Sequence, residues 1–345
     1  MKQNILFCGT PKFATTSLQA VFKCQDELNY NLKGVVTIPD KKAGRGQKKQ
    51  ESEIKKEAKK LNLNIFEPNK LTDNDFIQKI KQLNLDLIIV VAFKKLPQQL
   101  FTIPKQGTIN LHASLLPKYR GAAPINWAII NGENETGLTT FFINQKIDTG
   151  DIILQSKTKI SKECTAGELH DILMKKSPDI IKKTIKIIFS KKYKLKHQHT
   201  LQFSLAPKIQ KKDRILNIYK FYFNKSNTFN KLYNFIRGMS PPGVKTNIII
   251  EYQNKDVIKK TIIIKDVNKT IFNNKKIASK TKSNKVPILK ISNKNLLIQS
   301  DAEAILIKKI KVENGKEMSS EEFINGFLQK CTKIKFENTK EINVL

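Results

Sequence analysis

The 345-residue chain is long enough for two domains with separate cores, and its 39% apolar content indicates a folded protein. Its formal net charge of +33 comes from 63 Lys and Arg residues, only four of them arginines, and such a field attracts polyanions such as RNA. The four cysteines lack zinc-site or disulfide spacing, no stretch suits a membrane span, and the first residues leave no room for a signal peptide, so we expect a cytosolic protein.

The first half of the chain alternates strand-like and helix-like segments. Thr10 suits a helix N-cap and Pro11 the first helical position, so a strand, a tight turn and a helix follow one another. We expect strands at residues 5–8, 32–37, 85–91, 139–143 and 152–155, and helices at 13–22, 51–61 and 73–83. This alternation predicts a Rossmann-like, doubly wound α/β sheet. Such sheets bind ligands beyond the carboxyl ends of their strands, where residues 90–93 and 110–114 lie.

Polar residues mark a loop, a helix start and a linker along the chain. Residues 39–49 are basic and flanked by glycines, which is typical of a mobile surface loop. Thr165 and Glu168 form a capping box that opens a helix to about residue 189, in which His170 is interpreted as structural. Residues 191–206 are predicted to form a basic linker, with His197 and His199 in solvent rather than on a metal, because no third ligand lies nearby.

A second domain is predicted from residue 207 onward. It opens with a helix through residues 232–237, which ends at a Ser-Pro-Pro-Gly turn, and it closes with a helix from Ser319 or Ser320 to residue 328. Short strands are expected at residues 246–252, 257–265, 286–291, 296–299 and 304–312. About five short strands separated by turn residues suggest a small barrel, for which the oligonucleotide-binding fold is one candidate.

The most informative motif is the run from Ile109 to Pro124, which contains Asn110 and His112. Side chains two apart on a strand point to the same side, so one amide and one imidazole would face one pocket. Asp148, 36 residues after His112, lies in a Thr-Gly turn that could bring a carboxylate to the imidazole. An isolated Asn-x-His pair is more often a satisfied core pair, but the accompanying motifs in fixed order favour a catalytic site.

At this point the chain resembles the folate-dependent formyltransferases, and within them the members that act on methionyl-tRNA. The most specific match is residues 110–124, and further matches extend over nearly the whole chain, at residues 7–14, 39–46, 90–93, 206–209 and 315–319. The resemblance implies a formyltransferase domain at residues 1–190, the linker at 191–206, and a tRNA-binding barrel of oligonucleotide-binding (OB) type at 207–345.

The resemblance also implies a reaction. A formyl group would move from 10-formyltetrahydrofolate to the α-amino group of methionine on initiator tRNA, without a metal, in a monomeric enzyme of bacterial cytoplasmic type. Asn110 would donate a hydrogen bond to the developing oxyanion, and His112 would pass protons between the incoming and departing nitrogens. Asp148 would orient the imidazole and favour its positive charge.

Binding residues are implied in the same way. The folate would lie against Phe93, Ser114, Leu115, Leu116 and Pro117, with Asp151 near its pterin. The tRNA acceptor end would be held by a loop that contains Lys42, Arg45, Lys48 and Lys49, in which the arginine fork suits a phosphate or a base edge. Lys94 departs from the family pattern, where a glycine is common. Its long cation would either narrow the pterin pocket or point to solvent.

Two other functions stay open at this stage. The acceptor could be a small amine, such as a nucleotide-linked amino sugar or glycinamide ribonucleotide, which would need neither the Arg45 loop nor a basic barrel. The chain could also be a non-catalytic RNA-binding protein that kept the fold, in which case Asn110, His112 and Asp148 would be idle. Offering charged tRNA and small amines as acceptors tests the first alternative, and His112→Ala that leaves formylation of methionyl-tRNA unchanged would favour the second.

Overall fold

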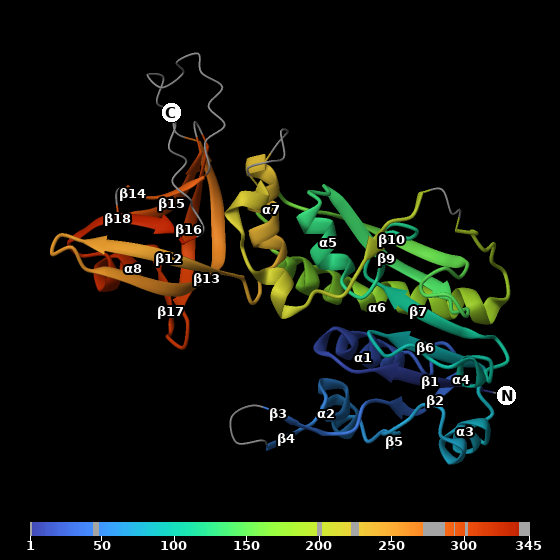
Figure 1. The fold of residues 1–345 in the computed structure, drawn as a ribbon. Coiled ribbons are helices and arrows are strands. Elements are labelled where there is room, and N and C mark those ends of the chain that lie inside the picture. Colours follow the sequence, from blue (N-terminus) through green and yellow to red (C-terminus); the bar gives the residue numbers. More distant parts are fainter. Residues whose placement is uncertain are drawn as a thin grey trace. The chain divides into compact units, whose positions relative to one another are not determined.

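A computed structural model describes residues 2–43, 48–198, 202–221, 228–271, 287–292, 294–300 and 303–337. The chain divides into two compact units that interleave along the sequence (Figure 1). The first unit contains Met1–Pro124, Glu135–Ile160 and Leu169–Pro207. The second unit contains Ile125–Asn134, Ser161–Glu168 and Lys208–Leu345.

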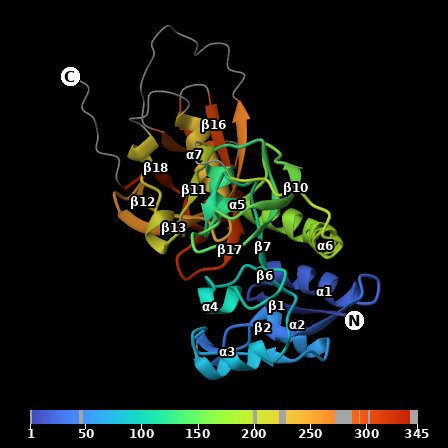
Figure 2. The same cartoon turned by 90° about the vertical axis from the view of Figure 1, so that its right-hand side faces the viewer.

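The first unit is built on a seven-stranded sheet with the order β10-β9-β7-β6-β1-β2-β5 (Figures 1 and 2). Its strands are β1 (Gln3–Gly9), β2 (Tyr30–Val36), β5 (Ile65–Phe66), β6 (Leu87–Val91), β7 (Thr108–His112), β9 (Glu135–Phe142) and β10 (Ile152–Lys159). The five strands from β5 to β7 pair in parallel, whereas β9 and β10 are antiparallel to their neighbours. The predicted doubly wound sheet is confirmed.

Helices flank this sheet on both sides. They are α1 (Thr15–Lys23), α2 (Glu53–Lys60), α3 (Asn74–Lys81), α4 (Gln98–Phe101) and most of α6 (Ala166–Ser190). Buried residues of α3 and α4 pack against alternate residues of β1 and β6, including Leu6 and Val90. α1 and α6 are joined by a hydrogen bond from Ser17 Oγ to Ser177 Oγ of 2.9 Å, and α6 is joined to β9 by the Thr140 and Thr184 hydroxyls.

Helix starts show how the sequence fixes these boundaries. Ser52 and Asp73 cap α2 and α3, since each side chain accepts a hydrogen bond from a backbone N–H three residues on. The predicted capping box of Thr165 and Glu168 is confirmed at the start of α6. The predicted N-cap at Thr10 is wrong. A short 3-10 turn, η1 (Lys12–Ala14), precedes α1, and Pro11 takes the cap position without a side-chain bond.

The segment predicted as a surface loop contains a small hairpin. Strands β3 (Lys41–Ala43) and β4 (Lys48–Gln50) pair antiparallel, so the loop prediction for residues 39–49 is wrong at both flanks. Arg45 lies outside the described residues. The base of the hairpin is tied to α2, because Lys55 Nζ lies 2.8 Å from Asp40 and 2.9 Å from Glu67. These two carboxylates raise the pKa of Lys55 above its ordinary value through hydrogen bonds, so the amine stays charged.

The second unit contains an antiparallel sheet with the order β14-β15-β16-β13-β12-β18, in which β17 also pairs with β16. Its strands are β12 (Val244–Tyr252), β13 (Val257–Ile271), β14 (Ile288–Ser292), β15 (Asn295–Ser300), β16 (Glu303–Val312), β17 (Glu317–Ser319) and β18 (Cys331–Phe336). The outer strands β14 and β18 approach each other, so the sheet nearly closes into the predicted barrel. α5 (Pro124–Ile130), α7 (Thr228–Gly238) and α8 (Ser320–Phe327) complete the unit.

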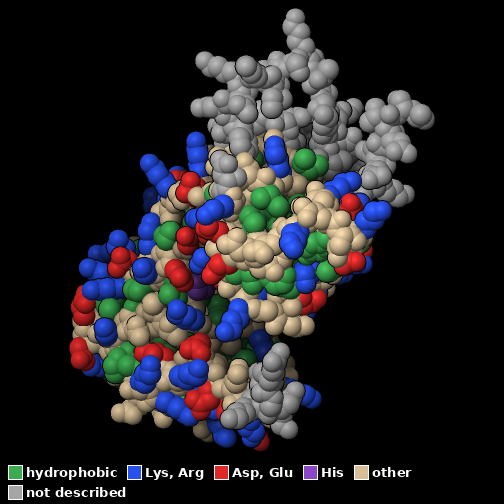
Figure 3. Space-filling model, turned by 90° about the vertical axis from the view of Figure 1, so that its left-hand side faces the viewer, with side chains coloured by type: hydrophobic (Ala, Val, Ile, Leu, Met, Phe, Trp, Pro, Cys, Tyr) green, Lys and Arg blue, Asp and Glu red, His purple; other side chains and the backbone are tan. Residues whose placement is uncertain are grey.

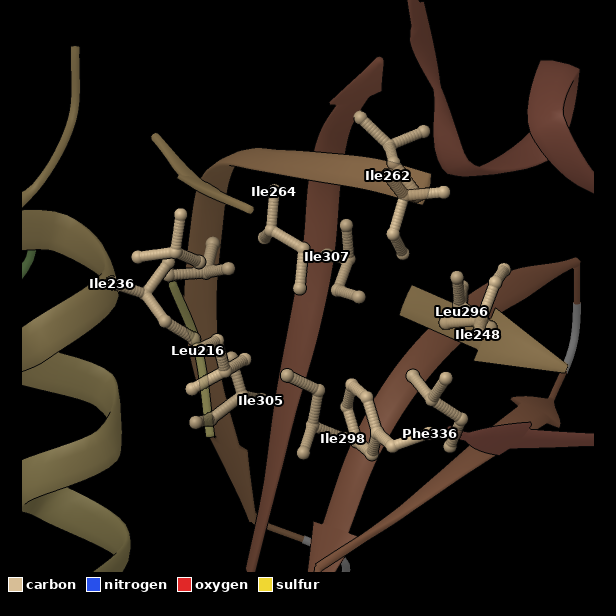
Figure 4. Close-up of a cluster of buried hydrophobic side chains, with 14 of the residues drawn as sticks. Leu216, Ile236, Ile248, Ile262, Ile264, Leu296, Ile298, Ile305, Ile307 and Phe336 are labelled. Carbon is tan, nitrogen blue, oxygen red and sulfur yellow. The ribbon is translucent and has the colours of Figure 1, made fainter. Parts of the chain in front are cut away.

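The five strands predicted for this unit are confirmed, whereas β17 and β18 were not foreseen. Inward side chains form a core of isoleucine, leucine and phenylalanine, of which Figure 4 shows Ile262, Ile264 and Ile307 pointing toward one another. Ile236 joins this core from α7. Ser319 caps α8 in a capping box with Glu322, which confirms the predicted helix start.

One short strand pairing and two 3-10 turns complete the description. β8 (Arg120–Gly121) and β11 (Leu205–Ala206) pair in parallel within the first unit, and the 3-10 turns η3 (Lys211–Arg214) and η4 (Ile218–Phe221) lie in the second. On the face drawn in Figure 3, Lys and Arg side chains are spread among acidic ones. Within the described parts of the chain, no helix is both long enough and apolar enough to cross a lipid bilayer.

We expect Ile307→Ala to lower the unfolding free energy of the second unit by about 2–5 kcal/mol, because it leaves a cavity in a fully buried core. Ile288→Ala is the matched control, since that side chain is 55% exposed and should change stability by less than about 0.5 kcal/mol. Trp127 is the only tryptophan and belongs to the second unit, so its fluorescence in urea reports this transition. Equal effects of the two substitutions would contradict the assigned core.

Candidate active site

The strand β7 presents Asn110 and His112 on one face of the first unit's sheet. Leu111 pairs with Thr140 of β9, whose hydroxyl meets α6, so Leu111 shares the face that α6 covers. Asn110 and His112 therefore point to the opposite face, because successive side chains of a strand alternate. Both residues lie in β7 with a regular register, as the predicted shared orientation of the amide and the imidazole requires.

The His112 imidazole lies between two groups of the protein. Its Nε2 is 2.8 Å from the backbone carbonyl oxygen of Tyr119, so Nε2 carries a proton and donates it. Its Nδ1 lies 3.7 Å from Oδ2 of Asp148, which is an ion-pair distance but too long for a hydrogen bond. Both side chains are largely buried, at 6% and 12% exposure, so their electrostatic interaction is only weakly screened by water.

Asp148 reaches this position from the loop between β9 and β10. Its backbone adopts the left-handed region, at φ 52°, which Asp tolerates better than most residues. Oδ2 of Asp148 accepts a hydrogen bond of 2.8 Å from the backbone N–H of Gly121. This bond fixes the carboxylate and keeps it facing His112.

The Asn110 amide differs from its two neighbours because it has no internal partner. Within residues 2–43, 48–198 and the later described ranges, no group hydrogen-bonds to its side chain, which is half-buried. A half-buried amide without a protein partner is available to a ligand. The structure thus places an unpaired donor, a proton-bearing imidazole and a carboxylate on adjacent elements.

The segment from Ser114 to Pro117 is fastened to the sheet. Ser114 is fully buried, and its hydroxyl donates to the carbonyl oxygen of Lys118 at 2.6 Å. The side chain of Leu116 is buried in a cluster with Phe141 and Ile152. Of the residues predicted to contact folate here, Leu115 and Pro117 are the partly exposed ones, so a ligand would meet these two side chains and the backbone.

The other predicted binding residues lie on several different elements. Phe93 is half-buried beside the core under α3, and Lys94 next to it is exposed. Oδ1 of Asp151 accepts a hydrogen bond of 2.8 Å from Nδ1 of His197. Lys49 is exposed on β4 and is the strand partner of Lys42 on β3. Lys48 is the strand partner of Ala43. Within the described part of the chain, no cluster of His, Cys, Asp and Glu could hold a metal ion.

Two further residues lie beside the Asp148 turn and were not predicted as site residues. Arg120 is 8% exposed, and its Nε and Nη2 donate to Oε1 of Gln198 at 3.1 and 2.7 Å. Burial lowers the pKa of Arg120 below its ordinary value, while the nearby charge of Asp148 acts to raise it. Arg120 stood out in the sequence as one of four arginines. Nothing singled out Gln198.

Comparison with known proteins places this geometry in a family. Residues 1–185 match the family described as formyl transferase, and residues 220–328 match the formyl transferase C-terminal domain. The chain therefore belongs to the formyl transferase family. Relatives that match nearly its whole length are named methionyl-tRNA formyltransferase, which confirms the resemblance carried by residues 110–124.

One such relative, from Clostridium beijerinckii, is 39% identical over 328 residues, covering 94% of this chain and 96% of the relative. Another, from Azobacteroides pseudotrichonymphae, is 45% identical over 257 residues, covering 72% and 75%. Among solved structures, a sugar 3N-formyl transferase matches with a TM-score of 0.59 at 22% identity, covering 89% of this chain and 97% of its own. An N-formyltransferase from Helicobacter canadensis matches with a TM-score of 0.59 at 20% identity, covering 89% and 99%. These structures share the fold.

We expect Gly150→Ala to destabilise the first unit by at least about 1–3 kcal/mol. A Cβ atom at Gly150 would lie 1.6 Å from the carbonyl oxygen of Phe142, so the turn that carries Asp148 would have to move. Gly326→Ala is the control, because a Cβ there meets nothing within 4 Å and helix α8 should gain about 0.5–1 kcal/mol. Thermal unfolding followed by circular dichroism checks both. An unchanged melting temperature for Gly150→Ala would refute the close approach.

Proposed function

We propose that this chain transfers the formyl group of 10-formyltetrahydrofolate to the α-amino group of methionine on initiator methionyl-tRNA, giving N-formylmethionyl-tRNA for translation initiation. Relatives named methionyl-tRNA formyltransferase match almost the whole chain. The two N-formyltransferases that share the fold were solved with 5-N-formyl-tetrahydrofolate or folinic acid. The observation that carries the proposal is the unpaired, half-buried amide of Asn110 on the same face as His112, with Asp148 beside it.

The reaction assigns a role to each of these groups. The methionyl nitrogen attacks the formyl carbon, and the carbonyl oxygen becomes an oxyanion that accepts a hydrogen bond from the free amide of Asn110. The C–N10 bond then breaks, the attacking nitrogen loses a proton, and N10 leaves with one. His112 moves these protons through Nε2, which donates to the Tyr119 carbonyl in the absence of substrate.

Asp148 acts on His112 by charge and does not touch the substrate. A carboxylate 3.7 Å from Nδ1 favours the imidazolium that forms as His112 takes up a proton. Because Gly121 holds the carboxylate, the stabilising charge is in place before the reaction begins.

The substrates would occupy different parts of the chain. Folate would lie against Phe93, Leu115 and Pro117 and the backbone of residues 114–117, with Asp151 near the pterin. The tRNA would contact Lys42, Arg45, Lys48 and Lys49 and the basic second domain, and the net charge of +33 supports phosphate contacts.

The domain roles follow the same division. We assign formyl transfer to residues 1–190 and tRNA binding to residues 207–345, with residues 191–206 as the connection. Aminoacylated tRNA as the acceptor supports a bacterial cytoplasmic location. The monomeric state stays a prediction from the sequence.

We expect His112→Ala and Asn110→Ala each to lower the rate of formyl transfer by roughly 10²- to 10³-fold, because each removes a group that stabilises the transition state. His170→Ala is the matched control, since that ring is partly exposed and pairs with Asp171 outside the site. The measurement is the mass of methionine released from charged tRNA after incubation with the formyl donor. Full activity of His112→Ala would favour an RNA-binding protein without catalysis, and formylation of small amines in place of charged tRNA would refute the assigned acceptor.

We expect the affinity for methionyl-tRNA to fall steeply between about 50 and 200 mM salt, because phosphate contacts release counterions. Filter binding over this range gives the slope, and Arg45→Ala should make it shallower if that side chain contacts a phosphate. A flat response of the unaltered chain would contradict electrostatic binding. Arg45→Lys keeps the charge but not the planar fork. Lower affinity for this variant would indicate a bidentate contact, and unchanged affinity would indicate that the charge alone matters.

A further inference from the structure

Residues 196–198 run antiparallel to residues 150–152, which follow Asp148. The backbones of Lys196 and Ile152 exchange two hydrogen bonds of 2.9 Å, and His197 meets Asp151 at 2.8 Å. The side chain of Gln198 donates to the carbonyl oxygen of Gly150 at 2.7 Å. Three consecutive residues thus fasten the end of the catalytic turn.

Gln198 is buried, at 3% exposure, and both ends of its amide are used. Its Oε1 accepts two hydrogen bonds from Arg120, and its Nε2 donates to Gly150. Arginine can only donate and a backbone carbonyl can only accept, so the partners fix the orientation of the amide. A buried amide with both ends satisfied is a stiff connection.

These contacts form a closed ring around Asp148. From Gln198, one route leads through its hydrogen bond to the Gly150 carbonyl and then along the backbone through Thr149 to Asp148. The other leads through Arg120 to the neighbouring N–H of Gly121, which donates to the Asp148 carboxylate. Every member of the ring belongs to the first unit.

We propose that Gln198 is a positioning residue, which holds the Asp148 turn against Arg120 and so keeps the carboxylate beside His112. The proposal rests on the proposed function, since it assigns Gln198 a part in the same reaction without contact to substrate. A displacement of about 1 Å in a catalytic group can cost up to about 10²-fold in rate, so loosening the ring acts on catalysis before it acts on binding.

The test uses Gln198→Met and Gln198→Glu in the full chain, with formylation of methionyl-tRNA as the readout. Methionine removes both hydrogen bonds. Glutamate keeps the acceptor for Arg120, so it protects the buried cation and the fold, but it loses the donor to Gly150. We expect each variant to lower kcat at least about tenfold, with KM for both substrates within about twofold. The melting temperature of Gln198→Glu should lie close to that of the unaltered chain. Lys194→Ala, a substitution of an exposed neighbour in the same segment, is the control and should have the kcat of the unaltered chain.

The decisive arm is the combination with Asp148→Asn. If Gln198 acts through Asp148, its substitution changes kcat less than about twofold once the carboxylate is gone, whereas a merely structural role gives multiplying losses. Multiplying losses, or full kcat in Gln198→Glu, overturn the proposal. If Asp148→Asn itself keeps full rate, the proposed role of Asp148 falls with it. If Asp148→Asn is slow and the Gln198 variants are not, only the Gln198 proposal falls.

Discussion

The central constraint on this structure is that a strand and a loop must bring an imidazole and a carboxylate together. His112 is fixed by the ladder of β7, which pairs on both sides with β6 and β9. Asp148 has no such support, because it lies in the connection between β9 and β10. The distance of 3.7 Å between Nδ1 of His112 and Oδ2 of Asp148 is therefore set by the contacts that hold the loop.

Three contacts hold the Asp148 loop in place, and each restricts which amino acid can occupy the position that makes it. Gly121 gives its N–H to the carboxylate, Gly150 lets the chain pass the Phe142 carbonyl without a Cβ, and Gln198 fills the space between Gly150 and Arg120. The first two need glycine for steric reasons, since Gly121 has φ 124°. The carboxylate is thus preorganised by backbone geometry, and the reaction does not have to reorganise it.

Much of the first unit could be predicted because its signals are local. Continuous apolar runs marked β1 and β6, a capping box marked α6, and a period of two placed Asn110 with His112. β18 was missed because three of its six residues are Thr or Lys, and only Ile334 and Phe336 are buried in the core. Gln198 could not be found in the same way. Its role depends on a segment 48 residues from Gly150 in sequence, and no local pattern encodes that meeting.

The arginines show how far composition can carry an inference. Their scarcity among 63 basic residues suggested positions where a planar fork is needed, and RNA was the expected partner. Arg120 and Arg237 instead direct their forks inward, to Gln198 and to the carbonyl oxygen of Cys164, and burial lowers the pKa of both. A lysine at either place would present a point charge to the same partners and leave part of a buried acceptor unpaired. Two of the four arginines thus serve buried geometry, and a role for Arg45 in tRNA binding has to rest on its basic sequence segment and its family rather than on its rarity.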